Sequence, residues 1–374
     1  MSQNVFSQFE EIEDPRIERS KRHRLLDIIG ITLCGVICGA DNWVEIEAYG
    51  KAKYEWLKQF LALPNGIPSH DTFGDVFARI DPAAFERCFQ AWVNELVDVN
   101  GGQVIAIDGK TLRGSSDSQS GKRAIHMVSA WASANGLVLG QVKVDEKSNE
   151  ITAIPALLDM LALTGCTVTI DAMGCQTAIA EQIVKQEAAY VLSLKENQGR
   201  LYEDVRDLFD HARHVYQSPY PLDHVRTVEK GHGRLEIREC WTLSDPHGFP
   251  ALRTTADWTG LRTLVMIQRE RRVNDHVSHE TAYFIASALD SANHFLACTR
   301  AHWSIENSLH WILDISFQED ASRVRKDFAP QNLALIRHFA LNLLKSDKAT
   351  KASIQTKRLK AGWDNTYLLK LLAV

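Results

Sequence analysis

The chain has 374 residues, of which 45% are hydrophobic and 24% are charged. This composition excludes a disordered or fibrous chain, and the length allows two or three domains of roughly 100–200 residues each. The formal net charge of −5 argues against a protein that coats nucleic acid indiscriminately, although it allows a local basic surface.

The cysteines and the N-terminal region bear on the compartment. Seven cysteines form no C-x-x-C pair, which argues against a disulfide framework or a structural zinc site and favours a reducing cytosol. The N-terminus, MSQNVFSQFEEIEDPR, is polar and acidic, unlike a signal peptide. The most apolar stretch, residues 25–40, is too short to cross a bilayer and contains Asp27. We therefore expect a cytoplasmic protein without membrane contact.

The first hundred residues have a helical pattern. A basic run at 16–24 precedes apolar residues at helical spacing over 42–61. Ser69 can cap a helix over 70–80, and Asp81 followed by Pro82 ends it and starts the next. Two helices around a proline-containing turn could form a DNA-reading helix-turn-helix or a simple small bundle.

Strand patterns begin after residues 100–102. We predict strands at 104–108, 125–133, 137–144, 166–171 and 190–194, with helices at 154–165 and 176–188. Further strand-like runs occupy 238–243, 261–270 and 281–289, and helical pattern returns at 291–317 and 332–345. The order predicts an α/β or α+β domain.

Two apolar strands each end on a carboxylate. VIAID ends at Asp108 and CTVTID ends at Asp171, so both acids would share one rim if the strands are neighbours. Carboxylate oxygens suit Mg²⁺, and two such ions roughly 3.5–4 Å apart can clamp a phosphoryl transfer. The alternatives are an Asp-Gly turn for Asp108 and a turn or helix cap for Asp171.

A third acid lies in the segment HWSIENSLHW. At helical spacing Glu306 shares a stripe with His302, His310 and apolar residues. A carboxylate on such a face needs a metal or a partner, because burying an unpaired charge is costly. The alternative is a pairing of Glu306 with either histidine at four-residue spacing.

Several long motifs occur in a fixed order: IAIDGKTLRGS, VTIDAMGCQ, YVLSLKENQ and HWSIENSLHWILDISFQED. In this order they resemble the DDE insertion-sequence transposases, in particular the H-repeat-associated group. The segments DPRIERSKRHRLLDI, CGADNWVEIEAYGKAK and LPNGIPSHDTFGDVFARID resemble the associated N-terminal domain of that group. The resemblance covers nearly the whole chain.

The resemblance implies a mixed α+β or α/β fold, with an RNase H-like catalytic core, a mainly β insertion and an all-α N-terminal domain. The implied domains are a helical DNA-binding domain at 1–98, the core at 99–199 and 290–345, the insertion at 200–289, and a basic C-terminal tail at 346–374. Asp108, Asp171 and Glu306 become the acidic triad, which would bind Mg²⁺ or, in its place, Mn²⁺.

One departure from the family pattern concerns the surroundings of the last acid. Many related transposases have Tyr and Arg before this acid and Lys after it. Here the corresponding positions are Thr299, His302 and Leu313. The departure weakens the expectation of hairpin-forming cleavage, in which those side chains handle the cleaved end.

Binding to DNA would depend on local charge. Residues 321–360 contain ten lysines and arginines against two aspartates, a formal balance of +8 that could attract phosphates or simply form a solvated face. Lys110 and Arg113 flank Asp108, where they could contact phosphate or neutralise surface acids. The residues expected at DNA are Lys110, Arg113, Lys195, Asn197, His302, Arg323, Arg325 and Lys326.

The predicted function is that of a DNA transposase, an endonuclease and strand transferase acting in the bacterial cytoplasm at the nucleoid. The resemblance implies double-stranded DNA with terminal inverted repeats as the partner, and a homodimer in the synaptic complex. Two alternatives stay open: an inactive or domesticated DNA-binding relic, and a general Mg²⁺-dependent nuclease.

Overall fold

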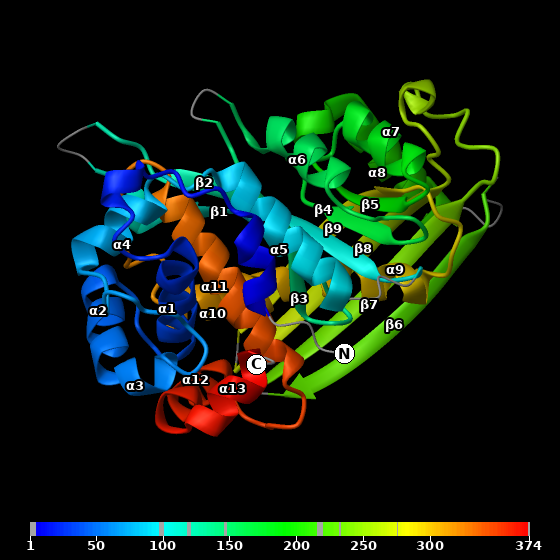
Figure 1. Cartoon of the computed structure of the whole chain (residues 1–374). Helices are drawn as coiled ribbons and strands as arrows, with labels where there is room; N and C mark the ends of the chain where they lie inside the picture. The colour runs from blue at the N-terminus through cyan, green and yellow to red at the C-terminus, as the bar shows by residue number, and fades with distance from the viewer. Residues whose placement is uncertain are drawn as a thin grey trace.

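The computed structural model describes residues 5–96, 101–117, 121–145, 148–214, 220–231, 233–274 and 276–372. Its centre is one nine-stranded sheet with the strand order β3-β2-β1-β4-β5-β9-β8-β7-β6 (Figure 1). Helices cover the sheet, and the N-terminal and C-terminal helices gather at one side of it.

Five strands form the predicted core. β1 (Val104–Leu112), β2 (Ile125–Ala132) and β3 (Leu137–Lys143) pair antiparallel, while β4 (Thr167–Ile170) and β5 (Ala189–Leu194) continue the sheet parallel to β1. The parallel connections run through α6 (Glu150–Asp159) and α7 (Thr177–Lys185). Residues 105–107 are fully buried, as the unbroken apolar run of β1 predicts. The predicted mixed α+β fold class is confirmed.

The β-rich insertion prolongs this sheet. It contains α8 (Gly199–His214), β6 (Leu222–Gly231), β7 (Arg234–Ser244), β8 (Thr263–Val273) and β9 (His276–Ala286). β9 pairs antiparallel with β5, so the insertion is joined to the core by strand hydrogen bonds. The sequence analysis missed β6 because its side chains are largely exposed, which leaves little apolar alternation to detect.

Helices pack on both faces and cover one edge of the sheet. α9 (Ala292–His302) packs against β1, β4 and β5, and α11 (Ala329–Ser346) packs against the edge strand β3. On that edge the Asn342 side chain accepts from the Val138 amide at 2.9 Å and donates to the Val138 carbonyl at 2.9 Å. α11 thereby protects an edge that could otherwise pair with another chain.

The N-terminal helices share a core with the rest of the chain. They are α1 (Leu25–Ile37), α2 (Trp43–Ala52), α3 (Tyr54–Leu57), α4 (His70–Phe77) and α5 (Pro82–Leu96). Phe9, Phe85, Phe89 and Trp92 all contact the ring of Phe339 on α11, at centroid distances of 4.8–6.1 Å. Residues 5–96 are therefore built into the protein as a small bundle.

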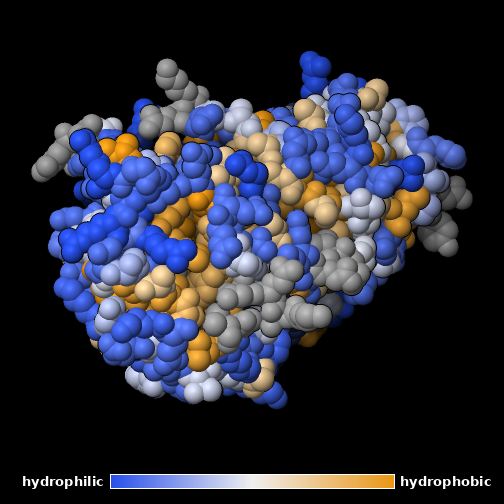
Figure 2. All heavy atoms as spheres, in the orientation of Figure 1, coloured by the Kyte–Doolittle hydropathy of each residue, from blue (hydrophilic) through white to orange (hydrophobic). Residues whose placement is uncertain are grey.

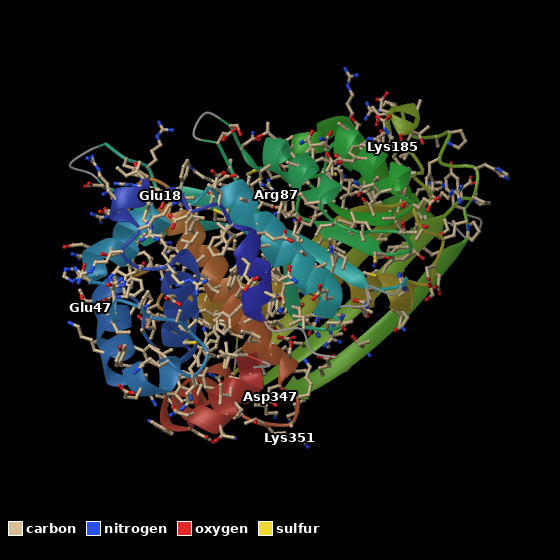
Figure 3. The ribbon with its side chains drawn as sticks, viewed as in Figure 1. Glu18, Glu47, Arg87, Lys185, Asp347 and Lys351 are labelled. Carbon is tan, nitrogen blue, oxygen red and sulfur yellow. The ribbon has the colours of Figure 1, made fainter. Side chains whose placement is uncertain are left out.

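The helix-turn-helix alternative finds less support in the surface of α4. Its exposed residues include Asp71 and Asp75, whose charges repel phosphates. Glu47 on α2, labelled in Figure 3, accepts from the backbone N–H of His70 at 2.7 Å and ties α2 to the start of α4. The pair behaves as a packed unit with an acidic outer face.

The expected basic tail is folded. α12 (Ile354–Trp363) and α13 (Asn365–Leu372) pack on α11, and the buried guanidinium of Arg358 donates to the Val36 carbonyl at 2.8 Å. Asp347, labelled in Figure 3, accepts from the Tyr367 hydroxyl at 2.9 Å and from Lys370 at 3.0 Å. Part of the charge in 321–360 is thus internal, because Arg337, Lys357 and Arg358 are buried.

The remaining surface agrees with an ordinary globular protein. On the face in Figure 2, hydrophilic residues dominate, and apolar residues are exposed mainly in a strip over the helical part. None of the helices in the described ranges has the length and apolar character needed to cross a membrane. All seven cysteines are free thiols.

The shorter helical segments complete the element list: the 3-10 turns Val5–Glu11, Glu18–Ser20, Arg113–Ser115, Glu196–Gln198 and Thr255–Asp257, the π-helical turn Glu306–His310, and α10 (Trp311–Ser316).

Candidate active site

Two of the predicted acids stand side by side on neighbouring strands, although β1 does not end at Asp108 as predicted but continues to Leu112, with Asp108 paired to Ser129 of β2. β1 and β4 are parallel neighbours, and their register pairs Ile107 with Ile170. Asp108 and Asp171 each follow directly, so they occupy equivalent places on strands that lie roughly 4.8 Å apart. The two strands that carry these acids are thus neighbours, as the predicted metal site requires.

A turn fixes the Asp171 carboxylate. Its Oδ1 accepts from the backbone N–H groups of Met173 at 3.1 Å and Gly174 at 3.3 Å. Asp171 therefore does form the turn expected as the alternative to a metal ligand, but these hydrogen bonds use only one oxygen of its carboxylate. The same turn orients the group at the rim, so capping and ligand roles are compatible.

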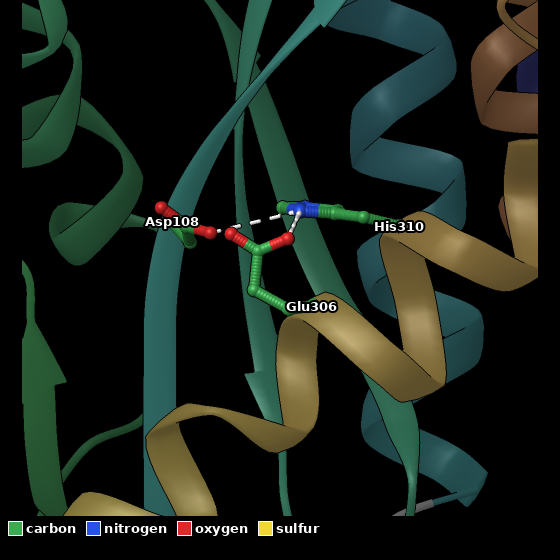
Figure 4. A group of neighbouring side chains, drawn as sticks. All are labelled: Asp108, Glu306 and His310. Carbon is green, nitrogen blue, oxygen red and sulfur yellow. Dashed lines mark ion pairs between the residues drawn. The ribbon is translucent and has the colours of Figure 1, made fainter. Parts of the chain in front are cut away.

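Glu306 faces Asp108 from a π-helical turn that follows α9. The turn spans Glu306–His310, and the Trp311 N–H donates to the Glu306 carbonyl, five residues back. The side chains of Glu306 and His310 project toward Asp108 on β1 (Figure 4). Ligand atoms of these three residues all lie within 4.8 Å of one another. The compact group thus contains His310, whereas Asp171 is held beside Asp108 by strand register.

The electrostatics of the group reflect crowded negative charge. Burial, then the charge of Glu306, raises the pKa of the Asp108 carboxyl. The nearby imidazole of His310, with Nδ1 3.6 Å from Glu306 Oε2, lowers the pKa of Glu306. A divalent cation among these oxygens would relieve the repulsion, and carboxylate and imidazole groups are suitable ligands. The residues present therefore fit a divalent metal.

His302 lies behind the acids. Its Nδ1 is 3.1 Å from the Thr169 hydroxyl on β4, and burial lowers the pKa of its imidazole. The ring is held against the sheet, so the expected contact with DNA finds no support in this position. We regard His302 as a packing residue of the helix that carries Glu306.

The expected DNA contact of Lys110 is also unsupported. Its ammonium is turned inward, 2.6 Å from Asp314 Oδ1 and 2.8 Å from Glu319 Oε2, and only 10% of the side chain is exposed. Glu319 is itself 2% exposed and lies 3.7 Å from Arg337. Lys110 therefore neutralises the buried Glu319 and the partly exposed Asp314, and it links α10 and the segment after it to β1.

The other basic residues of the predicted set lie nearer the surface. Arg113 has a side chain that is 81% exposed. Arg323 and Lys326 are exposed beside a cleft of about 560 Å³ that α2 and α4 also line, and the Lys326 ammonium is 2.5 Å from Asp75. Arg325 donates to the Gly114 carbonyl at 3.1 Å. The more exposed Arg113 and Arg323 are therefore better placed to contact a phosphate than Arg325 and Lys326, which have protein partners.

A larger cleft of about 830 Å³ starts at Asp171. Lys195, Asn197 and residues 280–283 of β9 line it. The Asn197 amide donates to the Ala172 carbonyl at 2.7 Å, so it supports the turn that orients Asp171. Lys195 is exposed along the same cleft.

Sequence reasoning missed two features of the site. The first is His310, which the sequence suggested only as a pairing partner of Glu306. Its four-residue spacing from Glu306 could have predicted that both side chains belong to the site. The second feature is an ion pair over Gly109, in which His126 Nε2 lies 2.6 Å from Glu150 Oε1. A Cβ on Gly109 would approach this oxygen closely, so a larger residue after Asp108 would have to displace the His126–Glu150 pair.

Comparison with known proteins identifies the family. The model described as DDE_Tnp_1-associated matches residues 6–93, and the Transposase DDE domain matches residues 100–343. The chain belongs to the DDE transposase family. The resemblance inferred from the sequence motifs is confirmed.

Named relatives cover almost the whole chain. Putative transposase YncI of Escherichia coli O157:H7 is 42% identical over 374 residues, covering 99% of this chain and 95% of the relative. H repeat-associated putative transposase YhhI of Escherichia coli K12 is 40% identical, covering 97% and 96%. A solved piggyBac transposase synaptic complex with hairpin DNA is 10% identical, with a TM-score of 0.44 and coverage of 99% of this chain and 77% of that one.

Proposed function

We propose that this member of the transposase family cleaves double-stranded DNA at the ends of a mobile element and joins those ends to target DNA. Asp108, Asp171 and Glu306 would hold the divalent ions that the reaction needs, Mg²⁺ or Mn²⁺. The proposal is supported by the register of β1 and β4, which puts Asp108 and Asp171 on neighbouring strands, and by the short distance between the carboxylates of Glu306 and Asp108.

Ions held by Asp108, Asp171 and Glu306 would supply the activation of water or a 3′-hydroxyl as nucleophile and the stabilisation of charge on the leaving 3′ oxygen. The chain supplies fixed ligands for them. Asp108 is held by a central strand, Asp171 by its turn, and Glu306 by a helix that packs on the sheet. Ligands on rigid elements keep the geometry that phosphoryl transfer needs.

The DNA path is proposed to follow the cleft that begins at Asp171. Lys195 would attract the phosphate backbone there, and Asn197 would act by supporting the Asp171 turn. Arg113 and Arg323 are exposed and could extend the contact to flanking DNA, such as terminal inverted repeats. A homodimer would bring two element ends together.

The test is a cleavage and strand-transfer assay with the full chain, Mg²⁺ and double-stranded DNA carrying candidate element ends. Wild type should give nicked and joined products, and Asp108→Asn and Asp171→Asn should give neither while still binding DNA. Asp207→Asn, which alters a carboxylate that is 70% exposed on α8, is the matched control and should keep full activity.

The alternatives predict different products. A general nuclease would cut DNA without regard to the element ends and would join nothing. A relic would bind the ends without cutting them, which the changes at Thr299, His302 and Leu313 would explain. Undiminished Mg²⁺-dependent strand transfer by Asp171→Asn would refute the role assigned to that acid.

A further inference from the structure

We propose that His310 is a nitrogen ligand of the ion that Asp108 and Glu306 hold, and that it gives this position a preference for Mn²⁺ over Mg²⁺. The inference rests on the proposed function, which supplies the carboxylate ligands. It adds an imidazole to a site that the sequence motifs describe as purely acidic.

The distances support a shared ion. His310 Nδ1 lies 3.6 Å from Asp108 Oδ2 and 3.6 Å from Glu306 Oε2. Both separations exceed those of an N–H···O hydrogen bond, roughly 2.7–3.2 Å. Two ligand atoms that are each about 2.0–2.2 Å from one ion lie roughly 3.0–3.6 Å apart, and the observed spacing falls at the upper end of that range.

Burial and orientation support the same role. His310 is 6% exposed, and its Nε2 is buried without a hydrogen-bond partner among the described residues. The other ring nitrogen, Nδ1, points at the carboxylates of Asp108 and Glu306. A neutral ring with its proton on Nε2 would present the lone pair of Nδ1 to an ion held between these two carboxylates.

The backbone at these residues is unusual. Glu306 and His310 begin and end a single π-helical turn between two α-helical segments. Such turns occur frequently at functional sites, because they re-aim side chains within an otherwise regular helix. Here the turn presents a carboxylate and an imidazole to the same strand (Figure 4).

The chemistry of the ligand sets the preference. Mg²⁺ takes oxygen ligands and releases water reluctantly, whereas transition ions bind imidazole well. Replacing His310 by Gln should therefore weaken Mn²⁺ binding by about 10-fold and Mg²⁺ binding much less. A residue that only positions the two acids would, when replaced, weaken both ions equally.

The experiment uses full-length, metal-free protein and Mn²⁺ alone as the probe, with pulsed electron paramagnetic resonance as the readout. Wild type should show coupling of the bound Mn²⁺ to ¹⁴N, which changes to ¹⁵N coupling in protein with ¹⁵N-labelled histidine. This labelling needs no substitution, so it does not depend on a variant that folds. The coupling should vanish in His310→Gln and persist in His302→Gln, the matched control.

Each outcome bears on the inference. Asp108-dependent Mn²⁺ binding without nitrogen coupling would overturn the role of His310 and leave the proposed function standing. Coupling that vanishes in His302→Gln and persists in His310→Gln, or an equal loss of Mn²⁺ and Mg²⁺ affinity in His310→Gln, would also overturn it. Absence of any Asp108-dependent Mn²⁺ binding would overturn both proposals.

Discussion

Lys110 provides the sharpest test of the interior beside the site. Replacing Lys110 by Met keeps the length of the side chain and removes its charge. Glu319, 2% exposed, would lose the cation at 2.8 Å and keep only Arg337 at 3.7 Å. Breaking a buried ion pair by removing one partner costs about 3–5 kcal/mol, and we expect a value near the lower end because Arg337 remains.

Urea unfolding of Lys110→Met should therefore show a free energy of unfolding lower by about 3 kcal/mol. The matched control is Arg113→Met, since Arg113 is 81% exposed and lies 3.4 Å from Asp320. An exposed pair of this kind contributes roughly 0–1 kcal/mol. Unchanged stability of Lys110→Met, together with weaker DNA binding, would refute the buried-network account and restore the DNA contact expected from the sequence.

Three further predictions concern other parts of the chain. Burial raises the pKa of Glu86 to about 8, so the folded state holds a proton that the unfolded chain releases near its ordinary pKa of 4.5. Wild-type stability then falls as pH rises from 4.5 to 8, and Glu86→Gln should lose that part of the fall in urea unfolding at pH 5 and pH 8.5. Gly114→Ala should destabilise the protein in thermal unfolding, because the new Cβ would clash with the backbone oxygen of Ser322. Asn197→Ala should lower strand transfer without lowering thermal stability, because it frees the turn that orients Asp171.

Each of these predictions has an outcome that would contradict it. The pH argument fails if Glu86→Gln and wild type lose stability in parallel between the two pH values. A Gly114→Ala protein with unaltered thermal unfolding would show that the contact with residue 322 is looser than described. Full strand transfer by Asn197→Ala would show that the Asp171 turn needs no support from this amide.

The sequence predicted the core strands and the acids because their signals are local. The unbroken apolar run of β1 and the carboxylate that ends it can be recognised without knowing any partner. The adjacency of β1 and β4 was only a condition of the prediction, because β2, β3 and α6 separate these two strands along the chain. The part of His310 in the site could also have been predicted, because its four-residue spacing from Glu306 places both side chains on one helix face.

The role of Lys110 was not predictable in the same way. Asp314 and Glu319, which neutralise it, lie more than two hundred residues away along the chain, and no local pattern shows that they return to β1. The same limit applies to the basic stretch 321–360. Counting its charges could not show that the Arg358 guanidinium would be buried against Val36, because that contact joins the two ends of the chain.

The central claim is that Asp108, Asp171 and Glu306 converge on divalent metal. X-ray data collected at the manganese edge from crystals of the full chain soaked in Mn²⁺ would test it, whichever DNA sequence the protein recognises. The account predicts an anomalous peak within about 2.5 Å of carboxylate oxygens of Asp108, with Asp171 or Glu306 completing the ligands. Peaks only elsewhere on the protein, with this rim empty at saturating Mn²⁺, would contradict it.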